Sequence, residues 1–288
     1  MCKKIQLIKL YCAVCQMYCT ITARDCQRLS NNFCPKFSDE ECITIYLWGI
    51  ANQKYEVKAC YDFIKDYWDG WFPDLPSYQN FNRRICNLCG VFELLASCLI
   101  TDSGIDFSVF DYLLDSMPIV VANERRSGSA KTAGELCNKG YCSSKKMYYY
   151  GVKLHALVQK QYKTLPKLFA AWVTPASEAD LTSAEETLDF IRDMKLFGDK
   201  AYISKAWKAE LASRNVTIVT PAKLSKGQTA LKPGETLVNS VIAAIRQPIE
   251  SFFGWVQEKT NIEKATKVRS ANGLLAFIFA RLAAIFLF

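Results

Sequence analysis

Histidine is nearly absent from this chain of 288 residues, which has a single one, His155. This argues against a histidine-based catalytic triad and against a metal site built from several histidines. A lone histidine in a strand is more often structural than catalytic. Cysteine is plentiful, but the count of 13 is odd and the residues are scattered. That usage argues against a disulfide framework and for a reducing compartment, so we expect a cytoplasmic protein.

Long apolar runs are also missing. The most apolar stretch, 274–288, is 15 residues long and contains Arg281, whereas a membrane-spanning helix needs about 20 residues. We expect a buried terminal helix there. At the other end, Lys3 and Lys4 precede an apolar run that polar residues interrupt, so we do not expect a signal peptide. No membrane partner is predicted.

The charge balance gives a mild bias toward a polyanionic partner, with a net charge of +8 from 36 Lys and Arg against 28 Asp and Glu. Half of the residues are apolar, which is typical of a globular protein, and the length suits two domains.

Two cysteine pairs, Cys12/Cys15 and Cys86/Cys89, have the spacing of zinc half-sites. Such pairs usually lie about 15–20 residues apart, and these are much further apart. On a helix, positions three apart share one face, and free cysteine packs well in a core. We therefore expect reduced, mostly buried cysteines and keep zinc as the alternative.

The first hundred residues predict a small all-helical domain, 1–105. A capping box, Ser38 to Glu41, opens one helix, apolar residues in 57–68 form the stripe of a second, and Ser77 is placed to cap a third. Short amphipathic helices suit a DNA reader, a dimerisation module or a scaffold, and the helical pattern does not choose among them.

The remainder, 106–288, predicts a mixed α/β domain. The expected elements, in order, are a strand at 109–121, a polar connection at 123–146, a half-buried strand at 148–158, a strand at 168–173, a helix after Ser177, a strand at 196–202, a helix around Trp207, a strand at 216–219 and a helix that leads to Glu250. This order is typical of a mixed sheet that begins with an antiparallel meander and is flanked by helices.

Three acids lie in or at the end of predicted elements of this domain: Asp115 in the first strand, Asp199 at the end of a later strand, and Glu250 in the late helix. Asp111 is the rival to Asp115. Arg246 and Glu250 are spaced to share one helix face, and Pro248 predicts that the helix starts afresh there. Hard oxygen ligands without histidine favour Mg²⁺ or Mn²⁺, and a pair of such ions supports phosphoryl transfer. The alternative to a metal site is a structural one, in which these acids form salt bridges.

An ordered set of motifs carries a resemblance: Asp115-Ser-Met-Pro, Tyr150-Gly-Val-Lys-Leu-His155, Thr174-Pro-Ala-Ser, Gly198-Asp-Lys-Ala-Tyr202, Arg246-x-x-x-Glu250 and Val268-Arg-Ser270. The series resembles bacterial insertion-sequence transposases of the DDE type.

That resemblance implies an RNase H-like core in which Asp115, Asp199 and Glu250 hold divalent metal and Arg246 contacts phosphate or carboxylate. It implies phosphodiester cleavage at terminal inverted repeats followed by strand transfer into target DNA, by a homodimer on double-stranded DNA. Two alternatives stay open: a non-catalytic DNA-binding protein derived from a transposase, and a nuclease without strand transfer.

Basic residues near these motifs are the expected contacts to DNA phosphates, which dominate nucleic-acid affinity. They are Arg246, Lys200, Lys153, Arg125, Arg126, Lys145, Lys146, Lys223 and Lys226.

Overall fold

The computed structural model describes residues 2–22, 35–106, 108–224 and 227–287. Within it the chain forms two compact units. A helical unit comprises 1–99, 131–135 and 256–288, and a sheet unit comprises 100–130 and 136–255. The expected mixed α/β fold with a helical region before it is confirmed.

The helical unit contains α1 (Lys3–Thr22), α2 (Asp39–Ala51), α3 (Val57–Tyr67), α4 (Tyr78–Asn87), α5 (Cys89–Thr101) as far as Leu99, and α9 (Ala271–Ala284). Short 3-10 turns are η1 (Asp69–Trp71) and η4 (Ile285–Leu287). The predicted capping box is confirmed: Ser38 Oγ accepts from the Glu41 N–H, and the Glu41 carboxylate accepts from the Ser38 N–H. Ser77 stands at the start of α4 without a side-chain cap hydrogen bond, so that detail of the prediction is wrong.

The C-terminal helix α9 packs against α2 and α4. Its buried face includes Leu274, Ile278 and Leu282, which confirms the expected buried terminal helix. The contacts therefore group 256–288 with the N-terminal helices, whereas a sequence boundary at residue 105 places them with the sheet. Among the described residues no single helix is long and apolar enough to cross a membrane, although the bent pair α4 and α5, at 58°, meets that test together.

The sheet unit contains β1 (Asp111–Ala122), β2 (Asn138–Cys142), β3 (Met147–Gln159), β4 (Lys167–Pro175), β5 (Met194–Phe197) and β6 (Val216–Val219). Its helices are α6 (Asp180–Thr187), α7 (Lys205–Ser213) and most of α8 (Pro233–Thr260), with 3-10 turns η2 (Glu124–Arg126) and η3 (Lys200–Tyr202). The strand order is β2-β3-β1-β5-β6, and β4 also pairs with β3. Strands β1, β3 and β4 are antiparallel neighbours, and β5 and β6 run parallel to β1.

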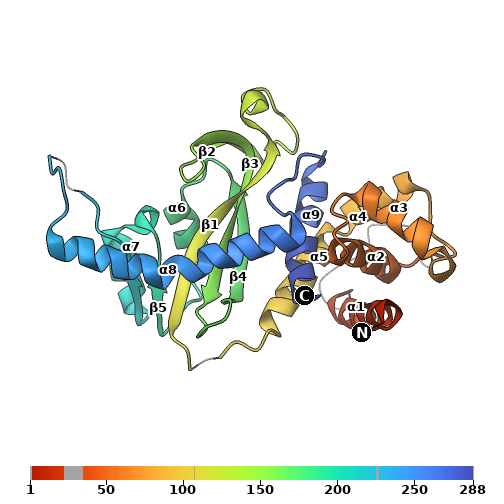
Figure 1. The fold of residues 1–288 in the computed structure, drawn as a ribbon, viewed down its shortest axis with the longest axis horizontal. Coiled ribbons are helices and arrows are strands. Elements are labelled where there is room, and N and C mark those ends of the chain that lie inside the picture. The colour runs from red at the N-terminus through yellow and green to blue at the C-terminus, as the bar shows by residue number, and fades with distance from the viewer. Residues whose placement is uncertain (1, 23–34, 107, 225–226, 288) are drawn as a thin grey trace. The chain divides into compact units, whose positions relative to one another are not determined.

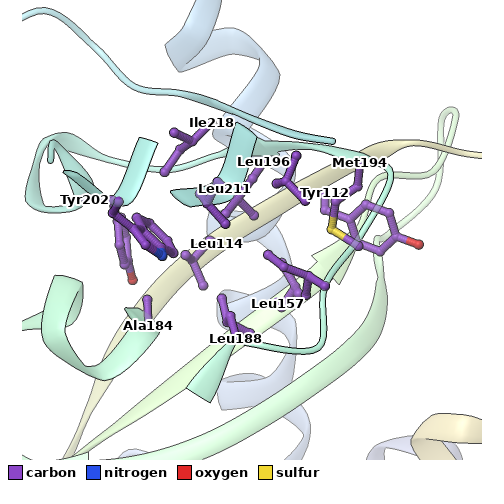
Figure 2. Close-up of a cluster of buried hydrophobic side chains, with 13 residues drawn as sticks. Tyr112, Leu114, Leu157, Ala184, Leu188, Met194, Leu196, Tyr202, Leu211 and Ile218 are labelled. Carbon is purple, nitrogen blue, oxygen red and sulfur yellow. The ribbon is translucent and has the colours of Figure 1, made fainter. Parts of the chain in front are cut away.

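The two faces of the sheet are covered differently. On one face, α6 and α7 bury a cluster that includes Leu114, Leu188, Leu196 and Leu211, and Figure 2 shows these side chains converging. Helix α8 crosses the other face (Figure 1). Because both faces are covered, β3 is almost wholly buried from Tyr149 to Gln159 rather than half-buried as its alternation predicted.

Two predictions about the connections are wrong. The segment 123–146 is not one polar loop, because Asn138–Cys142 pairs with Met147–Gly151 as a hairpin. Helix α8 does not start at Pro248 but runs through it from Pro233. The rule that favours proline at the first helical position applies to Pro233 instead. At Pro248 the ring removes the hydrogen bond to the Ala244 carbonyl, and Ala244 is an exposed residue.

The cysteine prediction is partly confirmed. Every described cysteine is a free thiol, but only Cys42, Cys60 and Cys137 are buried. Cys12 is exposed on α1, and Cys15, Cys86 and Cys89 are intermediate. Within the described part of the chain, no group of three or more His, Cys, Asp or Glu side chains is placed to hold a metal ion, zinc included.

Candidate active site

The strand register brings two of the predicted acids side by side. Leu113 on β1 pairs with Phe197 on the parallel strand β5. Two residues further along each chain are Asp115 and Asp199, so both carboxylates leave the sheet where β5 ends. Asp115 remains within β1, and Asp199 begins the turn η3, where its side chain accepts the Ala201 N–H at 2.7 Å.

A glycine makes this turn possible. A Cβ on Gly198 would lie 2.9 Å from the ring of Tyr202, which is closer than side chains pack. The missing side chain therefore lets Tyr202 fold back against the core, where it lies at one end of the buried cluster (Figure 2). The motif Gly198-Asp-Lys-Ala-Tyr202 thus ends β5, buries Tyr202 and leaves Asp199 partly exposed at the strand end.

Asp115 is held by an arginine from α8. Arg246 Nη2 donates to Asp115 Oδ2 at 3.0 Å, and the side chains are 12% and 22% exposed. Burial raises the pKa of Asp115 to about 6. Arg246 and the Ser116 N–H counteract this rise, whereas Asp199 and Asp180 add to it. Carboxylates that repel each other in a partly buried place are a setting that favours a divalent cation.

Glu250 lies one helical turn beyond Arg246 on α8 and is exposed. Residues four apart share one side of a helix, so α8 carries Glu250 on the same side as Arg246. Among the described residues, no three carboxylates are close enough together to hold a metal ion. The structure thus brings Asp115 and Asp199 together, with Arg246 rather than Glu250 as the α8 contact, and Glu250 stays a predicted member of the set.

A second polar group lies on the opposite face of β1, and sequence reasoning missed it. Asp180, the first residue of α6, accepts from Lys153 Nζ at 2.9 Å and from Ser116 Oγ at 3.2 Å. Lys153 also donates to the Glu178 carbonyl at 2.7 Å. The only early signal was that Asp180 follows the Thr174-Pro-Ala-Ser motif and can start a helix.

The single histidine belongs to this second group. His155 is fully buried and stacks on Trp172, with ring centroids 5.2 Å apart and planes 8° apart. Its Nε2 is 2.7 Å from Thr174 Oγ1, and its Nδ1 is 4.0 Å from Asp180. Burial lowers the pKa of His155 to about 4, although Asp180 opposes that effect. The ring is therefore neutral at pH 7, which suits a structural role.

Tyr202 connects the core to the acids. Its hydroxyl is buried and has no hydrogen-bond partner among the described residues. Burial raises the pKa of Tyr202 well above its usual value, and the charges of Asp180, Asp115 and Asp199 act in the same direction. The hydroxyl stays protonated and is a donor beside the carboxylates.

The predicted DNA-contacting cations fall into three groups. Arg246 and Lys153 are paired with acids, as described. Lys200 follows Asp199 and is exposed, as is Lys223 beyond β6. The third group lies where β1 ends and β3 begins. It consists of Arg125 and Arg126 in η2 and of Lys145 and Lys146 in the hairpin turn, all exposed.

The third group is well separated from the acids. Asp115 and Ala122 are seven positions apart on an extended strand, which corresponds to about 23 Å. Lys226 lies outside the described residues. Whether any of these cations touches DNA stays a prediction.

Comparison with known proteins decides the family. The family model described as a transposase DDE domain matches residues 112–287, which is more than half of the chain. This chain belongs to the DDE transposase family. The resemblance found in the sequence motifs is thereby confirmed. No curated protein and no solved structure matches the chain.

The match gives the geometry a context. In this DDE transposase the matched region begins on β1, three residues before Asp115, and ends in the last turn of the chain. It therefore includes the sheet, both acids at the end of β5, and the helix that carries Arg246 and Glu250. The matched family suggests a nuclease or transposase enzyme.

Proposed function

We propose that this DDE transposase cuts a phosphodiester at each end of its mobile element and joins the freed 3′-hydroxyl to target DNA. The observation that supports the proposal is that Asp115 and Asp199 each follow the last paired residues of β1 and β5, inside the matched region, close enough for the charge of Asp199 to raise the pKa of Asp115. Clustered acids are what the chemistry of this family would need, which gives a reason to hold two carboxylates close together in a partly buried place.

The donor set fits a divalent cation. Asp115 and Asp199 offer carboxylate oxygens, the ligands that Mg²⁺ and Mn²⁺ prefer. The raised pKa of Asp115 reports electrostatic repulsion and burial that a cation would relieve. Asp115 and Asp199 would hold the metal, and we expect Glu250 to join them from α8 when the metal binds; the bound metal would supply Lewis-acid activation of the attacking and leaving oxygens in phosphoryl transfer.

The side chains of this protein have separate tasks in that reaction. Arg246 fixes the orientation of the Asp115 carboxylate and keeps its pKa from rising further. Lys200, exposed next to Asp199, is placed to contact a phosphate of the bound strand. Tyr202 offers a hydroxyl donor from the core side.

Two displacements at phosphorus then follow one another. First, water attacks the phosphodiester at the element end, and the 3′-oxygen of the element leaves with a proton. Next, this 3′-hydroxyl attacks a phosphodiester of target DNA, and a target 3′-oxygen leaves. Both steps exchange one P–O bond for another, so a single site serves both.

The proposal extends to the partners. Two ends must be held at once, so we expect two copies of the chain on double-stranded DNA that carries terminal inverted repeats.

The test is an assay that separates cutting from joining. Purified protein is incubated with Mg²⁺, a labelled duplex bearing the element end and a supercoiled target plasmid. The transposase proposal predicts nicked duplex and labelled plasmid. Nicked duplex without labelled plasmid would identify a nuclease, and intact duplex with a normal gel shift would identify a non-catalytic DNA-binding protein.

A further inference from the structure

The helical unit contains a cavity of about 510 Å³ between the helices α3, α4 and α9 and the connection 261–270. Ligand sites are typically 300–1,000 Å³, so this cavity is large enough for a nucleotide-sized group. It lies outside the sheet unit and its acids.

The lining of this cavity is strongly cationic. Lys58, Lys264, Lys267, Arg269 and Arg281 line it, against a single carboxylate, Glu56. Lys58 is paired with Asp62. Lys264, Lys267 and Arg269 are exposed and form no ion pair among the described residues. Their charges are therefore available to an anionic ligand.

The floor of the cavity holds a buried cation without a counter-charge. Arg281 is 1% exposed, and all of its hydrogen bonds go to neutral oxygens. Nε donates to the Thr260 carbonyl at 3.0 Å and Nη1 to Tyr46 Oη at 3.0 Å. The guanidinium also lies 3.4 Å above the ring of Phe277. An arginine stays charged in proteins, so this site keeps an uncompensated positive charge below the cavity.

Two further features of the wall suit a phosphate. Helix α9 begins at the cavity, with Ser270 as its N-cap and with Ser270 and Gly273 in the lining. The first N–H groups of a helix and its dipole favour negative charge. Val268-Arg-Ser270, the sequence motif for which the catalytic proposal has no use, lines this same wall.

We propose that this cavity, the α9 cavity, binds the phosphate backbone of DNA as a contact site separate from the acids on the sheet. The identity of the anion as DNA rests on the proposed function.

The test uses the full chain with Lys264→Ala and Lys267→Ala combined, because neither side chain makes a hydrogen bond that stabilises the fold among the described residues. The matched control combines Lys9→Ala and Lys65→Ala, which remove the same charge from exposed positions of the same unit outside the cavity. Binding of a fluorescent random-sequence duplex is measured by anisotropy between about 50 and 200 mM salt. The cavity variant should bind about tenfold more weakly, and its slope of log K against log salt should be shallower by about 2. The control should show a much smaller loss of affinity and a much smaller change in slope.

A local readout completes the test. Lysine acylation followed by mass spectrometry, with and without DNA, should show protection of Lys264 and Lys267 but not of Lys65. Protection by millimolar inorganic phosphate with none by DNA would overturn the DNA assignment. Equal loss of affinity in the cavity variant and the control, with unprotected Lys264 and Lys267, would overturn the site itself.

These outcomes are distinct from failure of the catalytic proposal. A wild-type protein that never cuts DNA with Mg²⁺, yet loses binding in the cavity variant, would refute the chemistry and keep the cavity.

Discussion

Replacing Asp115 by asparagine should stabilise the protein at neutral pH. The carboxyl's pKa rises from 3.8 to about 6 in the folded chain, so the folded state holds the proton more tightly than the unfolded state does. The stabilising effect of this proton is complete below pH 3.8 and is lost as the pH rises through 6. Asparagine resembles the protonated form, so Asp115→Asn should gain about 1–3 kcal/mol at pH 7.5 and nearly nothing at pH 4.

The assay is thermal unfolding without divalent metal at pH values between 4 and 7.5. A gain of this size corresponds to a rise in melting temperature of about 2–4 °C per kcal/mol. Asp111→Asn, a carboxyl-to-amide change at the start of the same strand, is the matched control and should leave the melting temperature nearly unchanged. Equal stability of wild type and Asp115→Asn at pH 7.5 would refute the view that Asp115 is held at an electrostatic cost.

Three further predictions concern residues near the site. Arg246→Ala should lower nicking activity partly and move the acidic limb of its pH profile upward, because the positive charge of Arg246 lowers the pKa of Asp115; an unmoved limb would contradict the ion pair. As the pH falls from 6.5 to 4, wild type should lose about 1–3 kcal/mol of unfolding free energy, because burial holds the pKa of His155 near 4. His155→Phe should abolish this loss. Urea unfolding at these pH values measures it, and a wild type with no such loss would refute the buried neutral ring. Pro248→Ala should raise the free energy of unfolding by about 1–3 kcal/mol, because it restores one helix hydrogen bond inside α8; a destabilised variant would contradict this reasoning.

Local sequence patterns predicted most elements of the fold. Ser38 and Glu41 predict the start of α2 because a capping box depends only on hydrogen bonds among four neighbouring residues. The acids at the ends of strands were visible for a similar reason, since Asp115 and Asp199 each follow an apolar run. Pro248 misled the prediction because a proline marks either the start of a helix or a bend within one, and only the helical turns before it decide.

The parts that sequence did not predict depend on tertiary pairing. The sequence predicts a loop at β2 because its five residues, several of them polar, show little periodicity. Only their pairing with the start of β3 makes them a strand. The contact of Asp180 with Ser116 joins residues 64 apart in the chain. Arg281 appeared only as an interruption of an apolar run, whereas its hydrogen bond to Tyr46, 235 residues away, makes it the floor of a cavity.

In the proposed function, Asp115, Asp199 and Glu250 hold the metal for DNA cleavage. The most direct measurement compares Mg²⁺-dependent nicking of an end-bearing duplex with a gel shift on the same DNA, for Asp115→Asn, Asp199→Asn and Glu250→Gln. Each variant should lose nicking and keep binding, because affinity comes from basic surfaces whereas metal capture needs the negative oxygens. Full nicking by Glu250→Gln would contradict the claim and remove this glutamate from the active site.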